Sequence, residues 1–460
     1  MNLENLHSVY FLGIGGIGMS ALARWFHANG YAVTGYDKTA TSLTEKLVEE
    51  GIAVHYEDHV RNIPEKVKKD RDGALIIYTP AVPVDLNEYQ FFINEGFELY
   101  KRSQVLGMLT KSCYTIAVAG THGKTTTSSM IAHLLKSAGV DCSAFVGGIM
   151  TNYDSNLLIG VNNEVMVVEA DEFDRSFLTL HPDVAIITAT DADHLDIYGS
   201  KDSLKDSFNE FIKNIKANGQ LFIEEKVAAE LVLNPNGNIN VNTYGLNGGD
   251  ITISDLKIAN AKFEFTFKSH EGNAKGFALA MPGYHNVSNA LAAIASVGSL
   301  IKQDEQLVNG INTYLGVKRR FEYVIKSDDI VFIDDYAHHP EEIKALLESV
   351  RALYPNKKIT AIFQPHLFTR TRDFVDGFAE SLSMADHVIL LDIYPARELP
   401  IPGVNSEMIK EKMTNKSIRT YIKDDVLEYF DNHTPEVLLT IGAGNIDTLV
   451  SPIKKRLENK

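Results

Sequence analysis

The 460-residue sequence contains only two cysteines, Cys113 and Cys142, and no long apolar run. Two cysteines cannot form a disulfide framework, which favours a reducing compartment such as the cytoplasm. No stretch reaches the roughly 18 consecutive apolar residues of a membrane-spanning helix, and the first residues lack the basic segment of a secretion signal. The sequence therefore predicts a cytoplasmic protein without a membrane span.

Basic residues are also fewer than acidic ones. The sequence has 44 lysines and arginines and 60 aspartates and glutamates, which gives a formal net charge of −16. Such a surface repels nucleic acids and anionic membranes, so neither is an expected partner. An anionic ligand would need a locally positive or dipolar pocket. The composition is otherwise that of a globular protein, with 45% hydrophobic and 23% charged residues, and we find no repeat or low-complexity segment.

Short apolar runs alternate with helical patterns over most of the chain, which indicates an α/β fold built on parallel sheets. The pattern restarts near residues 107 and 316 and so predicts three domains, at residues 1–107, 108–316 and 317–460. We expect the first and third to be Rossmann-like and the second to be P-loop ATPase-like. Within the second, residues 219–279 show period-2 runs with turn signals, which predict an antiparallel annex.

A first glycine loop, Gly13 to Gly18, follows the apolar run VYFL and precedes a helical pattern. Glycines let the backbone approach a pyrophosphate, whose charge is stabilised by the free N–H groups of the helix. Asp37 lies 24 residues after Gly13, near the spacing of a ribose-binding acid. The loop predicts a dinucleotide or nucleotide-diphosphate site. A tight turn without a ligand, and a solvated or helix-capping Asp37, are the alternatives.

A second loop, GTHGKTTT from Gly120 to Thr127, joins the run YTIAVA to another helix. It offers glycines for close approach, Lys124 for the terminal phosphates and a threonine hydroxyl for Mg²⁺. It is shorter than the common phosphate loop, because Val118 stands where the first glycine is expected. The candidate ATP-binding residues here are Gly120, Thr121, His122, Gly123, Lys124, Thr125 and Thr126.

Acidic residues gather after the next two apolar runs, at Glu169, Asp171, Glu172 and Asp174 and again at residues 191–196. Adjacent parallel strands end at one sheet edge, and carboxylate oxygens are preferred Mg²⁺ ligands. The pattern predicts a magnesium site beside the lysine loop, although any one acid could be a solvated loop residue. Two phosphate loops disfavour a simple dehydrogenase and indicate ATP plus a second nucleotide-bearing substrate.

The motifs GIGGIGMS, AGTHGKTTT, EADEFDRSF, DADHLDIYG, PGYHNVSNALA, KRRFE, DDYAHHPEEI and FQPHLFTRTRD resemble, in this order, those of the Mur ligases of peptidoglycan synthesis. The resemblance covers essentially the whole chain. It implies a UDP-sugar domain, an ATP domain and a C-terminal amino-acid domain. It also implies an ATP-dependent ligase that activates the carboxylate of UDP-N-acetylmuramate as an acyl phosphate and joins it to L-alanine, with ATP and Mg²⁺, as a monomer or homodimer.

The same resemblance assigns roles to individual residues. The implied UDP-sugar ligands are Gly15, Gly16, Ile17, Gly18 and Asp37, and the implied metal ligands are Thr125, Glu169 and His194. His285, Asn286, Arg320 and Asp335 would complete the ATP site. His338 and Arg370 would lie at the alanine site, and Lys124, His194, Arg320, His338 and Arg370 would be the catalytic residues. The alternatives are Arg319 for Arg320, Asp334 for Asp335, and a helix-capping role for Asn286.

Two departures and two rivals accompany this prediction. Leu367 and Phe368 replace an arginine and a tyrosine typical of the family, and Arg372 is a possible substitute for the lost contact. Lys201 and Lys205 lie where some relatives carry a carbamylated lysine, but a solvated helix face is the preferred interpretation. The rivals are a recycling ligase that attaches a whole tripeptide and a nucleotide-regulated ATPase or binding module.

Overall fold

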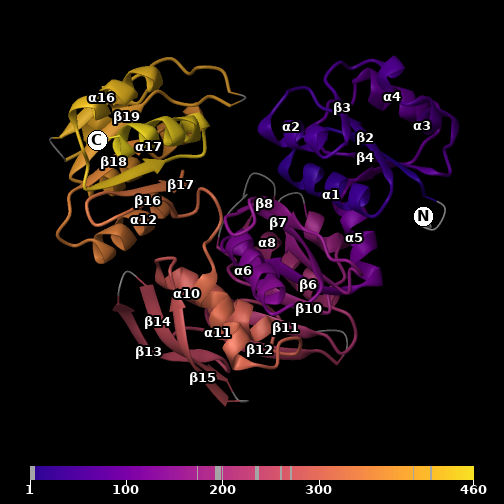
Figure 1. Ribbon diagram of the computed structural model, residues 1–460, viewed down its shortest axis with the longest axis horizontal. Coiled ribbons are helices and arrows are strands. Elements are labelled where there is room, and N and C mark those ends of the chain that lie inside the picture. The colour runs from indigo at the N-terminus through magenta and orange to yellow at the C-terminus, as the bar shows by residue number, and fades with distance from the viewer. Residues whose placement is uncertain are drawn as a thin grey trace. The chain divides into compact units, whose positions relative to one another are not determined.

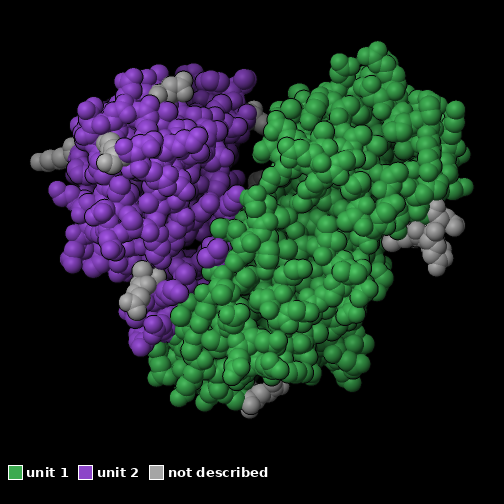
Figure 2. Space-filling model, in the orientation of Figure 1, with its two compact units in different colours: residues 1–256, 265–278, 288–314 green, residues 257–264, 279–287, 315–460 purple. Residues whose placement is uncertain are grey.

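A computed structural model describes residues 6–172, 175–191, 198, 200–233, 238–259, 262–269, 272–396, 398–414 and 417–459. The chain forms two compact units (Figure 2), one of residues 1–256, 265–278 and 288–314 and one of residues 257–264, 279–287 and 315–460. The first unit contains both of the α/β cores expected in the N-terminal half. The exact boundaries at 107 and 316 stay a prediction. None of the helices in the described ranges is long and apolar enough to cross a membrane.

The N-terminal part of the first unit is a five-stranded parallel sheet of order β3-β2-β1-β4-β5. Its strands β2, β3 and β4 are labelled in Figure 1. Its central strands are continuous apolar runs and are buried on both faces, as parallel strands covered by helices are. This confirms the Rossmann-like expectation. The elements are β1 Ser8–Leu12, α1 Ile17–Ala28, β2 Ala32–Tyr36, α2 Ser42–Glu49, β3 Ala53–His55, η2 Val60–Asn62, α3 Glu65–Lys69, β4 Ala74–Tyr78, α4 Asn87–Asn94, β5 Leu99–Lys101 and α5 Arg102–Ser112.

The central sheet has seven strands in the order β12-β11-β10-β6-β9-β7-β8. Its pairs are parallel except for the antiparallel pair β7–β8. The lysine loop leaves β6, which lies between β9 and β10, so the ends of both neighbours reach the loop. The elements are β6 Tyr114–Ala119, α6 Lys124–Ser137, β7 Cys142–Met150, β8 Ser155–Leu158, β9 Val165–Ala170, η3 Ser176–Thr179, β10 Val184–Ile187, α8 Lys201–Lys213, β11 Gln220–Glu224, α9 Glu225–Ala228, β12 Asn240–Tyr244, α10 Tyr284–Ser296 and α11 Asp304–Thr313.

The predicted annex is a separate three-stranded sheet of order β13-β14-β15, with strands Thr252–Ala259, Lys262–Ser269 and Gly272–Leu279. Consecutive strands are neighbours, as the period-2 runs and turn signals indicate. The division between the two compact units passes through this sheet.

The second unit is built on a six-stranded sheet of order β16-β17-β21-β18-β19-β20, in which only β16 is antiparallel to its neighbour. Separate apolar clusters pack on the sheet, as the Rossmann-like prediction requires. Its elements are β16 Glu322–Lys326, β17 Val331–Asp335, α12 Pro340–Leu353, β18 Ile359–Phe363, α13 Phe368–Asp373, α14 Val375–Leu382, β19 His387–Leu391, α15 Glu407–Lys412, β20 Ile418–Tyr421, η4 Lys423–Asp425, α16 Val426–Asn432, β21 Val437–Ile441, η5 Asn445–Leu449 and α17 Val450–Glu458.

Candidate functional site

The first glycine loop connects β1 to α1, and Asp37 closes it. The backbone N–H of Gly15 donates to Oδ2 of Asp37 at 2.7 Å, and the N–H of Thr39 donates to the other oxygen at 3.1 Å. A Cβ atom on Gly15 would lie 2.7 Å from Cγ2 of Thr44 and 2.9 Å from the Asp37 carboxylate. Glycine is therefore required at position 15, and the structure brings Asp37 to the loop as predicted. Its contact with a ribose stays a prediction.

Helix α1 begins at Ile17, directly after the loop. Its N-cap residue, Gly16, offers no side-chain hydrogen bond, and the first intrahelical bond runs from the N–H of Ser20 to the carbonyl of Gly16. The N–H groups of the first turn, which includes Gly18, therefore have no acceptor within the helix. The positive end of the helix dipole is exposed at the same point, which suits an anion.

The second loop has the predicted strand–loop–helix geometry, with Gly120 at φ +133° and Gly123 at φ +83°. Gly123 is the N-cap of α6, and a Cβ atom there would lie 2.7 Å from Oδ1 of Asn289. The end of β10 fixes the loop, since the N–H of Thr121 donates to the carbonyl of Ala189 at 3.0 Å and Thr188 donates to the carbonyl of His122. Both glycines are thus needed for this backbone conformation.

Lys124 is held by the loop and by one acidic residue. Its ε-amino group donates to the carbonyl of Gly120 at 2.7 Å and lies 2.8–2.9 Å from the two carboxylate oxygens of Glu172. The Glu172 side chain is fully buried, and burial raises its pKa although Lys124 acts in the opposite direction. The hydroxyl of Tyr198 donates to the backbone carbonyl of Glu172 at 2.5 Å. One of the four predicted metal acids is therefore the partner of the lysine.

Thr125 and Glu169 are brought together as the predicted metal site requires. The Thr125 hydroxyl donates to Oε1 of Glu169 at 2.9 Å, while Oε2 accepts the N–H of Gly147 at 2.8 Å. The third predicted ligand, His194, and the acid Asp174 lie outside the described residues. Within the described ranges, three or more acidic, histidine or cysteine side chains do not gather as a metal-binding group.

The two residues expected at the adenine, His285 and Asn286, begin helix α10. The side-chain amide of Asn286 donates to the carbonyl of Pro282 at 2.7 Å, and its backbone N–H donates to the carbonyl of Gly283 at 3.0 Å. The His285 ring lies over Gly283, where a Cβ atom would be 2.5 Å from Cε1. Asn286 is the third residue of α10 and donates in both contacts, whereas an N-cap side chain accepts, so these contacts are not those of a cap. Contact with adenine stays a prediction.

Of the two arginines before β16, Arg319 makes structural contacts with the sheet. Arg319 donates from Nε to Oδ2 of Asp334 at 3.3 Å and from Nη2 to the carbonyl of Gly442, so it ties the segment to the sheet. Asp335 accepts the N–H groups of Phe321 and Ala337 at 2.7 and 2.8 Å. Contact of Arg320 with a phosphate stays a prediction.

Asp334, near the end of β17, is buried, and Asp335, the last residue of the strand, is half-buried. Burial raises the pKa of Asp334 and of Asp335 to about 6 each. The oxygens of Asp335 are already used by backbone N–H groups. Its observed contacts are structural, and its predicted role at the ribose is a proposal.

The predicted alanine-site residues lie at the carboxyl ends of β17 and β18. The rings of His338 and His366 have centroids 6.4 Å apart, and His366 stacks on Tyr394 at 5.7 Å. Burial lowers the pKa of His366 to about 4, with the neighbouring charges of Arg370 and His338 acting in the same direction. Nη1 of Arg370 and Nδ1 of His366 are buried and have no hydrogen-bond partner among the described residues.

This cluster suits a carboxylate, because an arginine with an unused buried N–H presents a charged donor. His366 and Tyr394 were not among the residues singled out from the sequence. His366 stands inside the FQPHLFTRTRD motif, which is the signal that could have identified it. Tyr394 follows β19 in the segment LDIYPARELP, where no residue spacing indicated a contact with His366.

The residues that depart from the family pattern have local roles. Leu367 has φ +71° and donates its N–H to the carbonyl of Tyr394 at 3.0 Å, just before α13. Arg372 is half-exposed and pairs with Asp373 at 2.7 Å, so it is engaged there. Lys205 is only 24% exposed and pairs with Glu230 at 3.0 Å, so it is ion-paired and partly covered, unlike the solvated residue that we expected.

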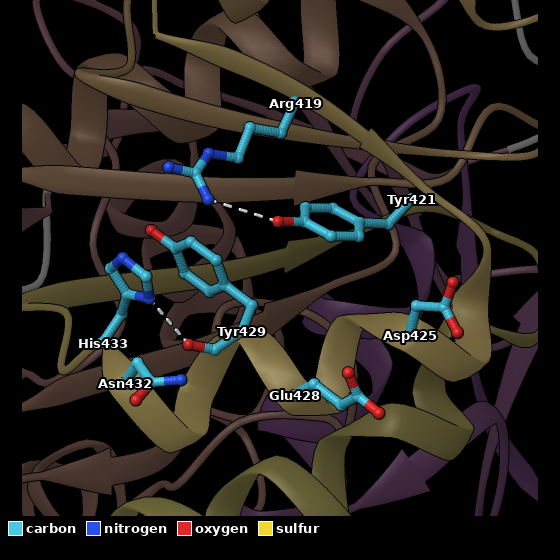
Figure 3. Close-up of a pocket in the computed structure, with 7 residues that line it drawn as sticks. All are labelled: Arg419, Tyr421, Asp425, Glu428, Tyr429, Asn432 and His433. Carbon is cyan, nitrogen blue, oxygen red and sulfur yellow. Dashed lines mark hydrogen bonds between the residues drawn. The ribbon is translucent and has the colours of Figure 1, made fainter.

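A cavity of about 350 Å³ lies between β20 and α16 and contains none of the predicted site residues (Figure 3). Arg419 donates to the hydroxyl of Tyr421 and lies over the ring of Tyr429. Asp425 and Glu428 also line it. Because its arginine is engaged and its carboxylates repel phosphates, this cavity does not suit the anionic ligands that the glycine loops indicate.

Two strand–glycine-loop–helix sites in one compact unit define a nucleotide-binding α/β protein. Family models match along the chain: the Mur ligase family, catalytic domain at residues 8–114, the Mur ligase middle domain at 118–297, and the Mur ligase, glutamate ligase domain at 319–444. The chain belongs to the Mur ligase family.

Individual relatives extend over the whole chain. It is 47% identical to the UDP-N-acetylmuramate–L-alanine ligase of Flavobacterium johnsoniae over 458 residues, which is 99% of each chain. The crystal structure of the UDP-N-acetylmuramate–alanine ligase of Thermotoga maritima is 29% identical with a TM-score of 0.82, covering 98% of this chain and 99% of that one. A murein peptide ligase of Psychrobacter arcticus shares the fold at 23% identity and a TM-score of 0.67, with 99% of each chain covered.

Proposed function

We propose that this chain joins L-alanine to the carboxylate of UDP-N-acetylmuramate at the expense of ATP, in the synthesis of peptidoglycan precursors. The observation that carries the proposal is the pair of phosphate loops in one unit, one with a lysine and an acidic partner and one without. A ligase that activates a nucleotide-sugar acid needs both. The full-length similarity to an enzyme of that name supports this choice of substrates.

Different residues act at successive steps of the proposed reaction. The loop at Lys124 binds the ATP phosphates, and the γ-phosphoryl group moves to a carboxylate oxygen of the sugar nucleotide while ADP leaves. The amine of alanine then attacks the acyl carbon, phosphate leaves, and the amine loses a proton. Lys124 lowers the barrier by neutralising charge that develops on the leaving ADP. Arg370 and His338 hold the carboxylate of alanine through charged and neutral N–H donors.

Thr125 and Glu169 fit a magnesium ion, because a hydroxyl and a carboxylate 2.9 Å apart are hard oxygen donors. When bound, Mg²⁺ would neutralise phosphate charge at this edge of the sheet. Gly15, Gly16, Ile17 and Gly18 would hold the diphosphate of the sugar nucleotide through backbone N–H groups. We further propose a cytoplasmic location, in accord with the two free cysteines, and a monomer or homodimer.

The rivals are less well supported. The peptide ligase shows a lower TM-score than the alanine ligase, 0.67 against 0.82. A regulated ATPase would not need the buried nitrogens of Arg370 and His366 in the second unit, which are unpaired among the described residues.

The test is to incubate the full chain with UDP-N-acetylmuramate, ATP, Mg²⁺ and one acceptor at a time. We expect one phosphate per product and a product mass equal to the sugar nucleotide plus L-alanine minus water. Phosphate release that is independent of any acceptor would support the ATPase rival. A product formed only with the tripeptide would identify the recycling ligase.

A further inference from the structure

Arg102, a residue that the sequence motifs did not single out, lies against the first glycine loop. It is the first residue of α5, directly after β5. A Cβ atom on Gly18 would lie 2.6 Å from Nη1, 2.9 Å from Cζ and 3.1 Å from Cδ of Arg102. The guanidinium group therefore covers the first turn of α1, and glycine at position 18 makes room for it.

The guanidinium group of Arg102 has no directly bonded acid among the described residues. Within the described ranges it forms no hydrogen bond and no ion pair. By contrast, Arg24 on α1 binds Glu50 at 2.6 Å, and Lys46 on α2 binds Asp154 at 3.0 Å. The chain has a formal net charge of −16. In it, a partly buried arginine without a directly bonded carboxylate can donate hydrogen bonds to an anionic ligand.

The position of Arg102 is fixed by the helix that it begins. The hydroxyl of Thr179, in η3, donates to the carbonyl of Ser103 at 2.8 Å. Gly107, one turn further on, lies so close to η3 that a Cβ atom would clash with the backbone carbonyl of Thr179. Helix α5 is thus packed tightly on the segment that follows β9.

That segment leads back to the acidic strand end. A small cavity of about 10 Å³, room for about one water molecule, is lined by Arg102 together with Glu169 and Asp171. The unused arginine at the first loop and the acids beside the lysine loop therefore face one another within one compact unit. Helix α5 holds Arg102 in place, and so it fixes the distance between a ligand bound to Arg102 and the predicted ATP site.

We propose that Arg102 binds the diphosphate of the sugar nucleotide and positions its carboxylate toward the end of β9. This inference rests on the proposed function. The guanidinium would add a bidentate, charged contact to the backbone N–H groups of the first turn, which alone supply only partial charge. Arg102 is a positioning residue, because it contacts the diphosphate and not the reacting carboxylate.

The test compares Arg102→Met and Arg102→Lys with a matched surface control, Arg61→Met, whose exposed side chain pairs with Glu57. Calorimetry measures binding of UDP and of UDP-N-acetylmuramate, and steady-state kinetics measure KM for all three substrates. We expect Arg102→Met to weaken both UDP ligands by about 10- to 100-fold, the range for a lost charged hydrogen bond. KM for ATP and alanine should stay within about twofold, and Arg102→Lys should recover part of the affinity.

Unchanged UDP binding in a folded Arg102→Met variant would overturn the proposal. So would a loss confined to UDP-N-acetylmuramate, since Arg102 would then bind the sugar carboxylate. If Arg102→Met does not fold, Arg102→Lys retains the charge, and full wild-type affinity and KM in that variant would contradict the bidentate contact. Failure of the wild-type chain to ligate alanine would refute the proposed function, whereas the UDP titrations would still test Arg102.

Discussion

The ε-amino group of Lys124 lies 2.8 Å from a carboxylate oxygen of Glu172, a side chain that is fully buried. The lysine begins α6 and the glutamate follows β9, the strand next to β6. The pair therefore fixes the lysine head group over its own loop. Removing one member of a buried pair usually leaves an uncompensated charge at a cost of about 3–5 kcal/mol. Glu172 can avoid that cost by protonation, because burial already raises its pKa.

Lys124→Met should therefore abolish ligation while leaving the protein folded. We expect kcat/KM for ATP to fall by at least about 100-fold, because loss of one charged transition-state contact costs about 3 kcal/mol. Phosphate release and a thermal melt would be measured on the same sample. Lys136→Met, at the exposed end of the same helix, is the control and should behave like wild type. Near wild-type turnover in the Lys124 variant would remove this loop from the reaction.

Turnover should require a divalent ion and should be restored by Mg²⁺ or Mn²⁺ after chelation. Glu169→Gln keeps the size of the side chain but removes its charge, so the Mg²⁺ concentration for half-maximal rate should rise by at least about tenfold, or roughly 1.4 kcal/mol. Glu164→Gln, an exposed residue just before the same strand, should leave it unchanged. Activity that survives complete chelation would show that the acidic strand ends do not bind a metal.

The sequence predicted those features of the site that depend on local chain geometry. The lysine loop was predictable because Gly120, Gly123 and Lys124 are close in sequence and between an apolar run and a helix. The partner of Lys124 was not predictable, because one acid lies near the end of β9 and three more follow it, and only packing selects Glu172. Arg102 lies 84 residues after Gly18, and no local pattern relates the two. Three-dimensional packing of separate elements decides such contacts.

A buried acidic cluster in the N-terminal sheet should make stability depend on pH. Tyr10 donates to Oε2 of Glu88 at 2.7 Å, the ring of His55 lies 2.8 Å from the same hydroxyl, and the N–H of His59 donates to Glu88. Burial, with Asp58 acting in the same direction, raises the pKa of Glu88 from 4.5 to about 7. Burial also lowers the pKa of His55.

Because the pKa of Glu88 is raised on folding, its contribution to stability is fully present below pH 4.5 and is lost as the pH rises through about 7. Glu88→Gln cannot ionise and should remove this loss. The free energy of unfolding of the variant, relative to wild type, should increase by up to about 3 kcal/mol between pH 4.5 and 8. Urea titrations across this range measure it, with the exposed Glu95→Gln as control. A pH-independent difference would exclude Glu88 as the titrating group.

The acceptor site should prefer L-alanine to glycine and L-serine, and tripeptides should be poor acceptors. Rejection of one extra or missing group in a small pocket is worth roughly 10- to 200-fold in kcat/KM, so glycine should still react slowly.

Arg370→Lys keeps the charge but loses the fork of N–H donors, one of which is buried and unpaired among the described residues. KM for alanine should therefore rise at least about tenfold while KM for ATP changes little. Arg372→Lys, two residues further on and paired with Asp373, is the matched control. Equal losses for ATP and alanine would remove Arg370 from the acceptor site, and a higher kcat/KM for the tripeptide would show that the pocket takes peptides.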